Sequence, residues 1–311
     1  MAGIGVILNP HSRSNRNNPD RVKRFGFIVG DKGSCHETKT LDDVKKLAHE
    51  FRDREIEILG ISGGDGTLHK TLSVFVDVYG KAKLPKIAFL RGGTMNNVAN
   101  TIGIRGTPEK ILSNMIVKYH RSEPFTETKL NLVKVNHSYG FLFGMVAVTN
   151  FIKHYESIPG EPTPFRAAYL LLYYLWLAVI KGNAVEEIFE PIEGKIFADG
   201  KELSFSEYTM IFGGTVENLC FQCRPLHQAR RLEDAFQMVA ASCTPRELLR
   251  LVPRTFFMKP MQSEKVENVI AKEVIFQFSE PISYMVDGDF PEPPTKTITI
   301  SMGPRLTCIV S

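Results

Sequence analysis

The chain has 311 residues, of which 43% are hydrophobic and 23% charged, close to the averages of soluble globular proteins. These values exclude a disordered, collagen-like or fibrous chain, and the length suggests two domains or one large one. The 38 Lys and Arg exceed the 34 Asp and Glu by a net charge of +4, which is too weak to predict a nucleic-acid partner.

The first 120 residues alternate between strand and helix patterns. Short apolar runs over 5–9, 25–29, 56–61 and 87–90 fit strands, and helical spacing of apolar residues predicts helices over 41–51, 68–78 and 108–119. A further helical stretch follows Met95, and Thr40 fits the N-cap of the helix that starts at residue 41. Strands that alternate with helices predict a three-layer α/β domain with a parallel sheet, which we assign to residues 1–124.

After about residue 124 the pattern becomes β-rich. The short runs that fit strands are 128–135, 139–146, 187–191, 194–197, 207–212, 236–240, 274–278, 283–286 and 295–302. Asp-Gly pairs at 199–200 and 287–288 are turn signals, and helices are expected near 165–182 and 245–252. We therefore assign residues 125–311 to an antiparallel β-sandwich domain, with its final segment a candidate for packing back on the first domain.

The longest uncharged apolar run covers residues 167–180. As a helix it would be about 21 Å long, short of the roughly 30 Å hydrocarbon core of a bilayer. Helical spacing places Tyr169, Tyr173 and Trp176 on one face, and such side chains suit a membrane interface or a lipid-lined cleft. The alternative is a core helix packed on the sandwich.

Cysteine usage fits a reducing compartment, because the five cysteines are scattered and odd in number. Cys220 and Cys223 form one C-x-x-C pair without a second pair at zinc-site spacing, so buried thiols are the expectation. The N-terminus lacks the pattern of a signal peptide, which favours a cytoplasmic protein.

Two glycine-rich turns carry the strongest functional signal. They are Gly63-Gly64-Asp65-Gly66-Thr67 and Gly92-Gly93-Thr94-Met95-Asn96-Asn97, and each follows a predicted strand and precedes a predicted helix. Glycine lets the backbone approach a ligand, and the N-terminus of the following helix suits phosphate. Together with Asn9-Pro10-His11-Ser12 after the first strand, the turns would line one edge of a sheet. Plain tight turns are the alternative.

Asp65 indicates how a phosphate would have to be bound. A carboxylate in an anion-binding turn repels phosphates unless Mg²⁺ or a polar network separates the two. The P-loop pattern, a G-x-G-x-x-G after the first strand and the G-x-S-x-G elbow are all missing from the sequence. These absences argue against a P-loop enzyme and weaken the case for a dinucleotide oxidoreductase or a hydrolase with that elbow.

The motif order resembles that of the diacylglycerol kinase and sphingosine kinase superfamily of lipid kinases, most closely its bacterial diacylglycerol kinases. The resemblance rests on the three segments above and on Val286-Asp287-Gly288-Asp289 near the C-terminus. It implies ATP and Mg²⁺ as cofactors and a lipid hydroxyl as acceptor, with diacylglycerol favoured over ceramide or a sphingoid base. It also implies a peripheral membrane enzyme, with a homodimer as one option and without a nucleic-acid partner.

The resemblance also implies roles for individual residues. Asp289 would act as the catalytic base with Asp287 beside it, Asp65 would organise Mg²⁺ and the phosphates, and Asp234 would correspond to a ligand of a structural Mg²⁺. The residues expected around ATP are Asn9, Pro10, His11, Ser12, Arg13, Thr38, Gly63, Gly64, Asp65, Gly66, Thr67, Gly93, Thr94 and Asn96.

Three positions and one short segment depart from the pattern of that superfamily. Arg13 stands where glycine is usual, Asn97 where aspartate is usual, and Asp289 where glutamate is usual; the segment 232–235 keeps only Asp234 of the metal-binding pattern. These departures leave two other functions open. One is a kinase of NAD or another small molecule, since the first glycine turn is shared with NAD kinases, and the other is a catalytically impaired nucleotide or lipid binder.

Overall fold

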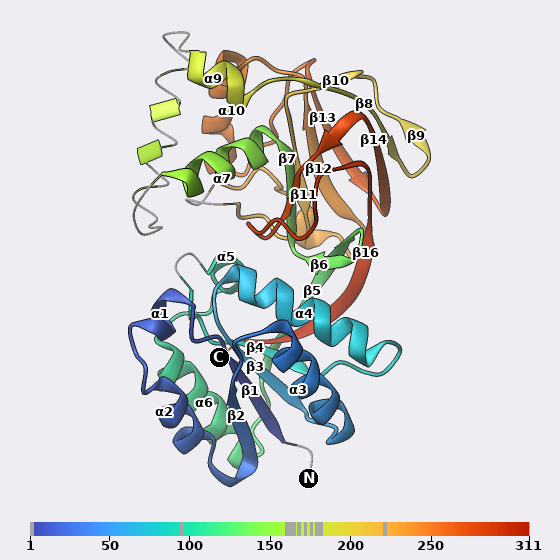
Figure 1. Ribbon diagram of the computed structural model, residues 1–311. Coiled ribbons are helices and arrows are strands. Elements are labelled where there is room, and N and C mark those ends of the chain that lie inside the picture. The colour runs from blue at the N-terminus through green and yellow to red at the C-terminus, as the bar shows by residue number, and fades with distance from the viewer. Residues whose placement is uncertain are drawn as a thin grey trace. The chain divides into compact units, whose positions relative to one another are not determined.

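We describe the protein from a computed structural model. The structure describes residues 3–93, 96–158, 183–219 and 223–310, together with Arg166, Tyr169, Leu170, Tyr173, Tyr174 and Leu177. The chain divides into two compact units, which we call unit 1 (residues 1–130 and 304–311) and unit 2 (residues 131–303). Figure 1 labels the elements in chain order.

Unit 1 is built on a parallel sheet in the order β2-β1-β3-β4, completed by the last part of β16, where Cys308 pairs with Ile87. The strands are β1 Ile4–Leu8, β2 Gly33–Glu37, β3 Ile58–Ser62, β4 Lys86–Phe89 and β16 Thr295–Val310. Every residue of β1 and β3 is buried, which parallel strands require when helices cover both faces of their sheet.

The helices of unit 1 form two layers around this sheet. The α-helices are α1 Arg13–Arg16, α2 Arg21–Val29, α3 Leu41–Asp53, α4 Asp65–Tyr79, α5 Asn97–Thr101 and α6 Pro108–His120, and Gly30–Lys32 is a 3₁₀ turn. Helices α3 and α4 pack together, as do α2 and α6, and Figure 1 shows these two pairs on opposite sides of the sheet. The predicted three-layer α/β arrangement is confirmed.

Local signals explain where these helices begin. Thr40 caps α3 with a capping box, in which its hydroxyl accepts from the Asp43 N–H and the Asp43 carboxylate accepts from the Thr40 N–H. Thr107 caps α6 through its hydroxyl alone, which accepts from the Lys110 N–H at 3.3 Å, and Pro108 occupies the first helical position.

Unit 2 is an antiparallel sandwich. One sheet has the order β13-β12-β11-β7-β15, and the strands of the other follow the order β10-β8-β14-β16, with β5 pairing β16 and β6, and β9 pairing β8. The buried core is shared by side chains from both sheets, including Phe143 and Phe236 from the first and Phe276 and Ile298 from the second. The predicted sandwich is confirmed.

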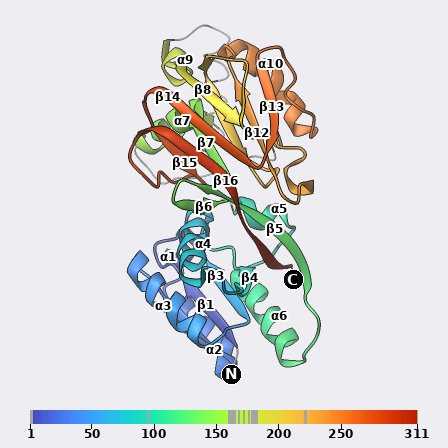
Figure 2. The same ribbon diagram turned by 90° about the vertical axis from the view of Figure 1, so that its right-hand side faces the viewer.

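The elements of the second part of the chain are as follows. The strands are β5 Thr126–Val135, β6 Ser138–Gly140, β7 Leu142–Val146, β8 Ile192–Ala198, β9 Lys201–Glu202, β10 Glu207–Tyr208, β11 Met210–Gly214, β12 Phe236–Ala241, β13 Val266–Ala271, β14 Glu273–Ile282 and β15 Tyr284–Val286. The helices are α7 Ala147–Ser157, α9 Asn183–Ile188 and α10 Pro245–Phe256, and Ala229–Arg231 is a 3₁₀ turn. Figure 2 shows the same elements from the side.

Two strand predictions are wrong. Residues 25–29 lie in α2, where Phe25 and Val29 are buried and Phe27 is 89% exposed; this is helical periodicity, which a five-residue window cannot separate from a buried strand. Residues 187–191 contain the end of α9, and Ile188 packs in a small apolar cluster rather than in a sheet.

The elements that were not predicted include β2, β13 and α7. Strand β2 carries the polar sequence Gly-Ser-Cys-His-Glu at a sheet edge, β13 exposes every second residue, and α7 follows β7 without a turn signal. Among the described residues, no helix is both long and apolar enough to cross a bilayer.

Candidate functional site

The predicted nucleotide-binding residues of unit 1 gather at one edge of its sheet. Strand register pairs Leu8 with Ser62 and with Glu37, and Ile61 with Phe89, so the loops after β1, β2, β3 and β4 begin at the same level. Thr38 is buried in this row, and its N–H donates to the Leu8 carbonyl. Parallel topology alone therefore brings these segments together at the carboxyl ends of the strands, where α/β sheets bind ligands.

The loop after β1 is bonded to the neighbouring turn. The Asn9 backbone N–H donates to the Ser62 carbonyl at 3.0 Å, and its side-chain amide donates to Thr67 Oγ1 at 2.8 Å. The Asn9 side-chain oxygen accepts from the His11 N–H, and the Ser12 hydroxyl donates to the Asn9 carbonyl. Asn9 therefore fixes its own loop and joins it to the first turn of α4.

The two glycine turns lie in backbone contact. A Cβ atom added to Gly93 would come within 2.2 Å of Gly64 Cα, and one added to Gly92 would come within 2.6 Å of the Gly63 nitrogen. A Cβ on Gly63 would meet the Thr67 side chain at 2.4 Å. These glycines are thus required by the packing of one turn against the other, before any ligand is considered.

Asp65 joins the two turns through its side chain. It is the first residue of α4, and its carboxylate accepts from the Asn97 N–H at 3.0 Å and the Val98 N–H at 3.4 Å, at the start of α5. Burial raises the pKa of Asp65, while these two N–H groups and Arg91 act in the opposite direction. A buried carboxylate held by two backbone donors serves as a fixed anchor between the turns.

Asn96 closes the second turn in a left-handed conformation, with φ of 51°. Its side chain accepts from the Gly93 N–H at 3.1 Å and donates to the Gly93 carbonyl at 3.0 Å. Asparagine tolerates this conformation because its short polar side chain can bond locally. Thr94, which was predicted to contact ATP, lies outside the described residues.

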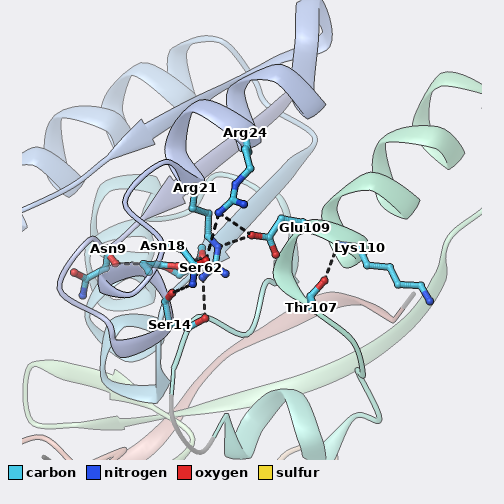
Figure 3. A network of polar contacts seen from close by, with 10 residues as sticks. Asn9, Ser14, Asn18, Arg21, Arg24, Ser62, Thr107, Glu109 and Lys110 are labelled. Atoms are coloured by element: carbon cyan, nitrogen blue, oxygen red, sulfur yellow. Dashed lines mark hydrogen bonds and ion pairs between the residues drawn. The ribbon is translucent and has the colours of Figure 1, made fainter.

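The sequence did not reveal a polar network that supports the first loop. Arg21, only 5% exposed, donates from Nε to Glu109 Oε1 at 2.8 Å and from one terminal nitrogen to Asn15 Oδ1 at 2.9 Å. Asn15 in turn donates to the carbonyls of Asn9 and Ser62. Figure 3 shows this chain of contacts running from α6 through α2 to the loop. Burial alone would raise the pKa of Glu109, but the bond and charge of Arg21 outweigh it and lower that pKa.

The first turn of α4 presents backbone hydrogen-bond donors beside the loop after β1. Helix α4 has 15 residues, and its leading N–H groups have no intrahelical acceptors, so they present donors and partial positive charge at the edge shared by the loops. The predicted ligands Gly66 and Thr67 belong to this turn, while Pro10, His11, Ser12 and Arg13 lie in the neighbouring loop or at the start of α1. The donor set fits the phosphates of a nucleotide.

In unit 2, Asp287 and Gly288 form the tight turn of a β-hairpin. Both have positive φ, 49° and 92°, and the backbones of Val286 and Asp289 exchange hydrogen bonds of 2.9 and 3.0 Å. The Asp287 carboxylate accepts from the backbone N–H groups of Phe141 and Leu142 at 2.8–3.2 Å. This bonding gives Asp287 a clear structural task, which is to tie the hairpin to the start of β7.

Asp289 follows this turn and lies near α7. Burial and then the charge of Asp289 raise the pKa of Glu156, which is on α7. One turn earlier on the same helix, Lys153 Nζ donates to Ser283 Oγ at 2.7 Å and lies 5.7 Å from the centre of the Phe290 ring. Asp289 therefore sits among ionisable groups of α7, none of which the sequence had assigned to it.

The predicted structural metal site does not fit the described residues. Asp234 is exposed, and the neighbouring carbonyls of Leu232 and Glu233 accept from the Asn131 amide. Within the part of the chain that the structure describes, no group of three or more His, Cys, Asp or Glu side chains could hold a metal ion. We derive no step through a structural Mg²⁺.

The predicted lipid-contact residues are partly described. Tyr169 is 71% exposed and Tyr173 41% exposed, whereas Leu170, Tyr174 and Leu177 are buried in a cluster with residues of α7 and α9. At the described positions the core packing is therefore observed for Leu170, Tyr174 and Leu177, while lipid contact by the exposed Tyr169 and Tyr173 stays a prediction. Trp176 lies outside the described residues.

Comparison with known proteins supports the resemblance. Residues 3–124 match the family model of the diacylglycerol kinase catalytic domain, which covers the glycine turns and the first loop. The structure of a diacylglycerol kinase from Bacillus anthracis str. Sterne aligns with 99% of this chain and 97% of its own, with a TM-score of 0.67 and 15% identity. Two further structures from the same strain align over the same shares, with TM-scores of 0.72 and 0.70 and identities of 16% and 17%.

These comparisons differ in what they establish. The structural alignments show that the fold is shared along almost the whole chain. The domain match shows the resemblance to the diacylglycerol kinase superfamily in residues 3–124. No curated protein matches the sequence significantly.

Proposed function

We propose that the protein is a lipid kinase that transfers the γ-phosphate of Mg-ATP to a lipid hydroxyl, with diacylglycerol as the first acceptor to test. The observation that carries the proposal is the edge of the unit 1 sheet, where Asn9 and Asp65 bond three loops together around the N-terminus of α4 and Asn96 closes one of these loops on itself. The match of residues 3–124 to the diacylglycerol kinase catalytic domain supports the same reaction class.

Phosphoryl transfer depends on positioning and charge stabilisation more than on covalent chemistry. The N–H groups at the start of α4 and of the turn after β4 would donate to phosphate oxygens, and Mg²⁺ enters with ATP as part of the substrate. Asp65, fixed by the start of α5, would orient the two turns and the Mg-phosphate group. The packed glycines hold this arrangement before ATP arrives, which lowers the cost of ordering it on binding.

The acceptor side of the proposal rests on Asp289. The lipid oxygen attacks the γ-phosphorus, the bond from that phosphorus to the bridging oxygen of ADP breaks, and the hydroxyl proton passes to the Asp289 carboxylate. Aspartate is one methylene shorter than the glutamate usual in the superfamily, and a base must come within about 2.6–3.2 Å of the proton it removes. The exposed rings of Tyr169 and Tyr173 are proposed to meet the acyl chains or the membrane interface.

A panel of acceptors tests the reaction. Radiolabelled ATP is supplied with diacylglycerol, ceramide, a sphingoid base, a polyprenol or NAD, and we expect label in a lipid, with diacylglycerol first. Label in NAD alone would replace the lipid kinase with a small-molecule kinase. ATP that raises the melting temperature while no acceptor is labelled would instead identify a nucleotide binder without this activity.

Asp65→Asn tests the site assignment. We expect a loss of about 100-fold or more in kcat, because a neutral amide cannot hold the charge balance of the Mg-phosphate group. Asp77→Asn is the matched control, since Asp77 is exposed on the same helix, and it should keep wild-type activity. Full activity in the Asp65 variant would overturn the assignment.

A further inference from the structure

Helix α10 in unit 2 has a basic outer face that the proposed reaction does not use. Leu248, Leu251 and Thr255 are buried on its inner face. Arg246, Arg250 and Arg254 are exposed and recur every four residues. Side chains at this spacing project from the same face of a helix, so the three arginines form one stripe.

Two adjacent aromatic side chains lie at the end of this stripe. Phe256 is 50% exposed and Phe257 is 75% exposed, and Lys259 follows them on the surface. Among the exposed large hydrophobic residues of the described chain, these two are the only sequence neighbours. We call the set of Arg246, Arg250, Arg254, Phe256, Phe257 and Lys259 the α10 surface.

The charge of the α10 surface is not balanced by the acid beside it. Between residues 245 and 259 there are four basic residues and one acid, Glu247. The Glu247 carboxylate accepts from the Thr244 cap and pairs with Lys265 Nζ at 2.9 Å, just before β13. Glu247 thus bonds to the cap and to Lys265, and residues 245–259 carry three more basic than acidic side chains.

We propose that the α10 surface docks on an anionic lipid bilayer. The arginine stems lie along apolar surface while their guanidinium groups reach lipid phosphates, often with two parallel hydrogen bonds. Exposed phenylalanine rings enter the boundary between headgroups and acyl chains, which offsets the cost of leaving them in water. A basic face with aromatic residues at one end complements a negatively charged leaflet in both charge and polarity.

This inference rests in part on the proposed function, because a lipid acceptor has to be reached in a membrane. The α10 surface would be a second membrane contact, separate from the exposed Tyr169 and Tyr173. It would also give the protein its preference for anionic lipid. Docking would raise the local concentration of acceptor without changing the chemistry at Asp289. Activity on an acceptor dispersed in neutral detergent micelles should therefore be independent of the α10 surface.

Vesicle flotation tests the α10 surface. The probes are vesicles of phosphatidylcholine alone and of equal parts phosphatidylcholine and phosphatidylglycerol, and the wild-type protein should float with the second only. Replacing two charges with Arg250→Gln and Lys259→Gln should weaken binding about 30-fold, and added salt should weaken wild-type binding in the same direction. Phe256→Ser with Phe257→Ser should also reduce binding, at every salt concentration.

Phe27→Ser is the matched control, because Phe27 is 89% exposed on α2, where the nearby Lys23 is paired with Asp20. It should float like wild type, and all variants should keep the wild-type melting temperature because the changed side chains are exposed. Equal flotation of the α10 variants and wild type would overturn the inference, as would equal weakening by Phe27→Ser. Loss of binding to an oligonucleotide, with no flotation of wild type, would assign the surface to nucleic acid instead.

The micelle assay separates this result from the proposed function. A wild-type protein that floats through α10 but phosphorylates no acceptor would refute the kinase reaction and leave the docking surface standing. A protein that phosphorylates a lipid, but whose α10 variants float like wild type, would refute the docking surface and leave the kinase reaction standing.

Discussion

In unit 1 the motif residues bond to one another, whereas in unit 2 the motif aspartates bond to a neighbouring strand or lie beside a helix that carries no motif. Asn9 and Asp65 join three loops of one sheet edge, and Asn96 closes one of these loops on itself. The Asp287 carboxylate bonds a hairpin to the start of β7, and the charge of Asp289 helps to raise the pKa of Glu156 on α7. Parallel topology thus brings loops from neighbouring strand ends together, while the antiparallel sandwich presents single residues on turns.

Because of this difference, we expect substitutions in the two motifs to affect folding to different extents. The turns of unit 1 touch through glycine backbones, so their geometry is over-determined by packing. The hairpin of unit 2 needs only an Asp-Gly pair with positive φ and the two amides of Phe141 and Leu142. We expect substitution of the proposed base, Asp289, to lower catalytic activity without affecting folding. Asp287, two positions earlier, provides the comparison.

The largest expected effect separates Asp289 from Asp287. Asp289→Asn should reduce kcat about 100-fold or more, because a positioned base contributes that much, and should leave the unfolding free energy unchanged. Asp287→Asn should lower the unfolding free energy by about 1–2 kcal/mol, since the amide keeps one acceptor for two backbone N–H groups. Steady-state kinetics and urea unfolding measure the two.

The reverse outcome would exchange the roles. If Asp287→Asn reduces kcat strongly at unchanged stability while Asp289→Asn is active, Asp287 is the base, and the contrast drawn between the two units is wrong.

The second expected effect concerns the network under the first loop. Arg21→Leu should lower the unfolding free energy by about 2–4 kcal/mol, because it leaves the partly buried Glu109 and Asn15 without their donor. It should also raise KM for ATP more than it lowers kcat, since Asn15 holds the Asn9 loop. Chemical denaturation and ATP kinetics provide the measurements.

Arg24→Leu is the control for this variant. Arg24 is half exposed and lies 3.7 Å from the same Glu109 oxygen, so its loss should change stability by no more than about 0.5 kcal/mol. Equal effects of the two substitutions would show that the network is a surface ion pair and does not support the loop.

Much of unit 1 could be predicted from sequence because local signals and topology agree there. Thr40 caps α3 as expected, and the glycine turns follow β3 and β4, so parallel pairing must bring them to one edge. Arg21 could not be found in this way, because its partner Glu109 lies 88 positions away and neither residue stands in a motif. The bonding of Asp65 to α5 likewise depends on tertiary packing.

Unit 2 was harder to predict for a different reason. Its strands are short, and an edge strand such as β13 carries polar residues that obscure the alternation of apolar and polar positions by which strands are predicted. Helix α7 carries Lys153 and Glu156 to the Asp289 hairpin from more than 130 positions away, without a motif of its own. The predicted base could be chosen from sequence, but its surroundings could not.

The smallest expected effect compares one glutamate in each unit at acid pH. The pKa of Glu109 is lowered, and that of Glu247 is lowered to about 2 by the bond from Lys265 and then by the Thr244 N–H. Both folded pKa values lie below the unfolded value near 4.5, so both stabilise the protein above about pH 4.5, and this stability is lost as the pH falls through each folded pKa. High salt should raise the Glu247 pKa toward its ordinary value, because its pair with Lys265 is exposed, and should change that of Glu109 less, because Arg21 is buried. Carboxyl titration by NMR at low and high salt, with Glu109→Gln and Glu247→Gln to assign the signals, measures this difference; equal salt shifts would show that the Arg21 network is as exposed to solvent as the cap of α10.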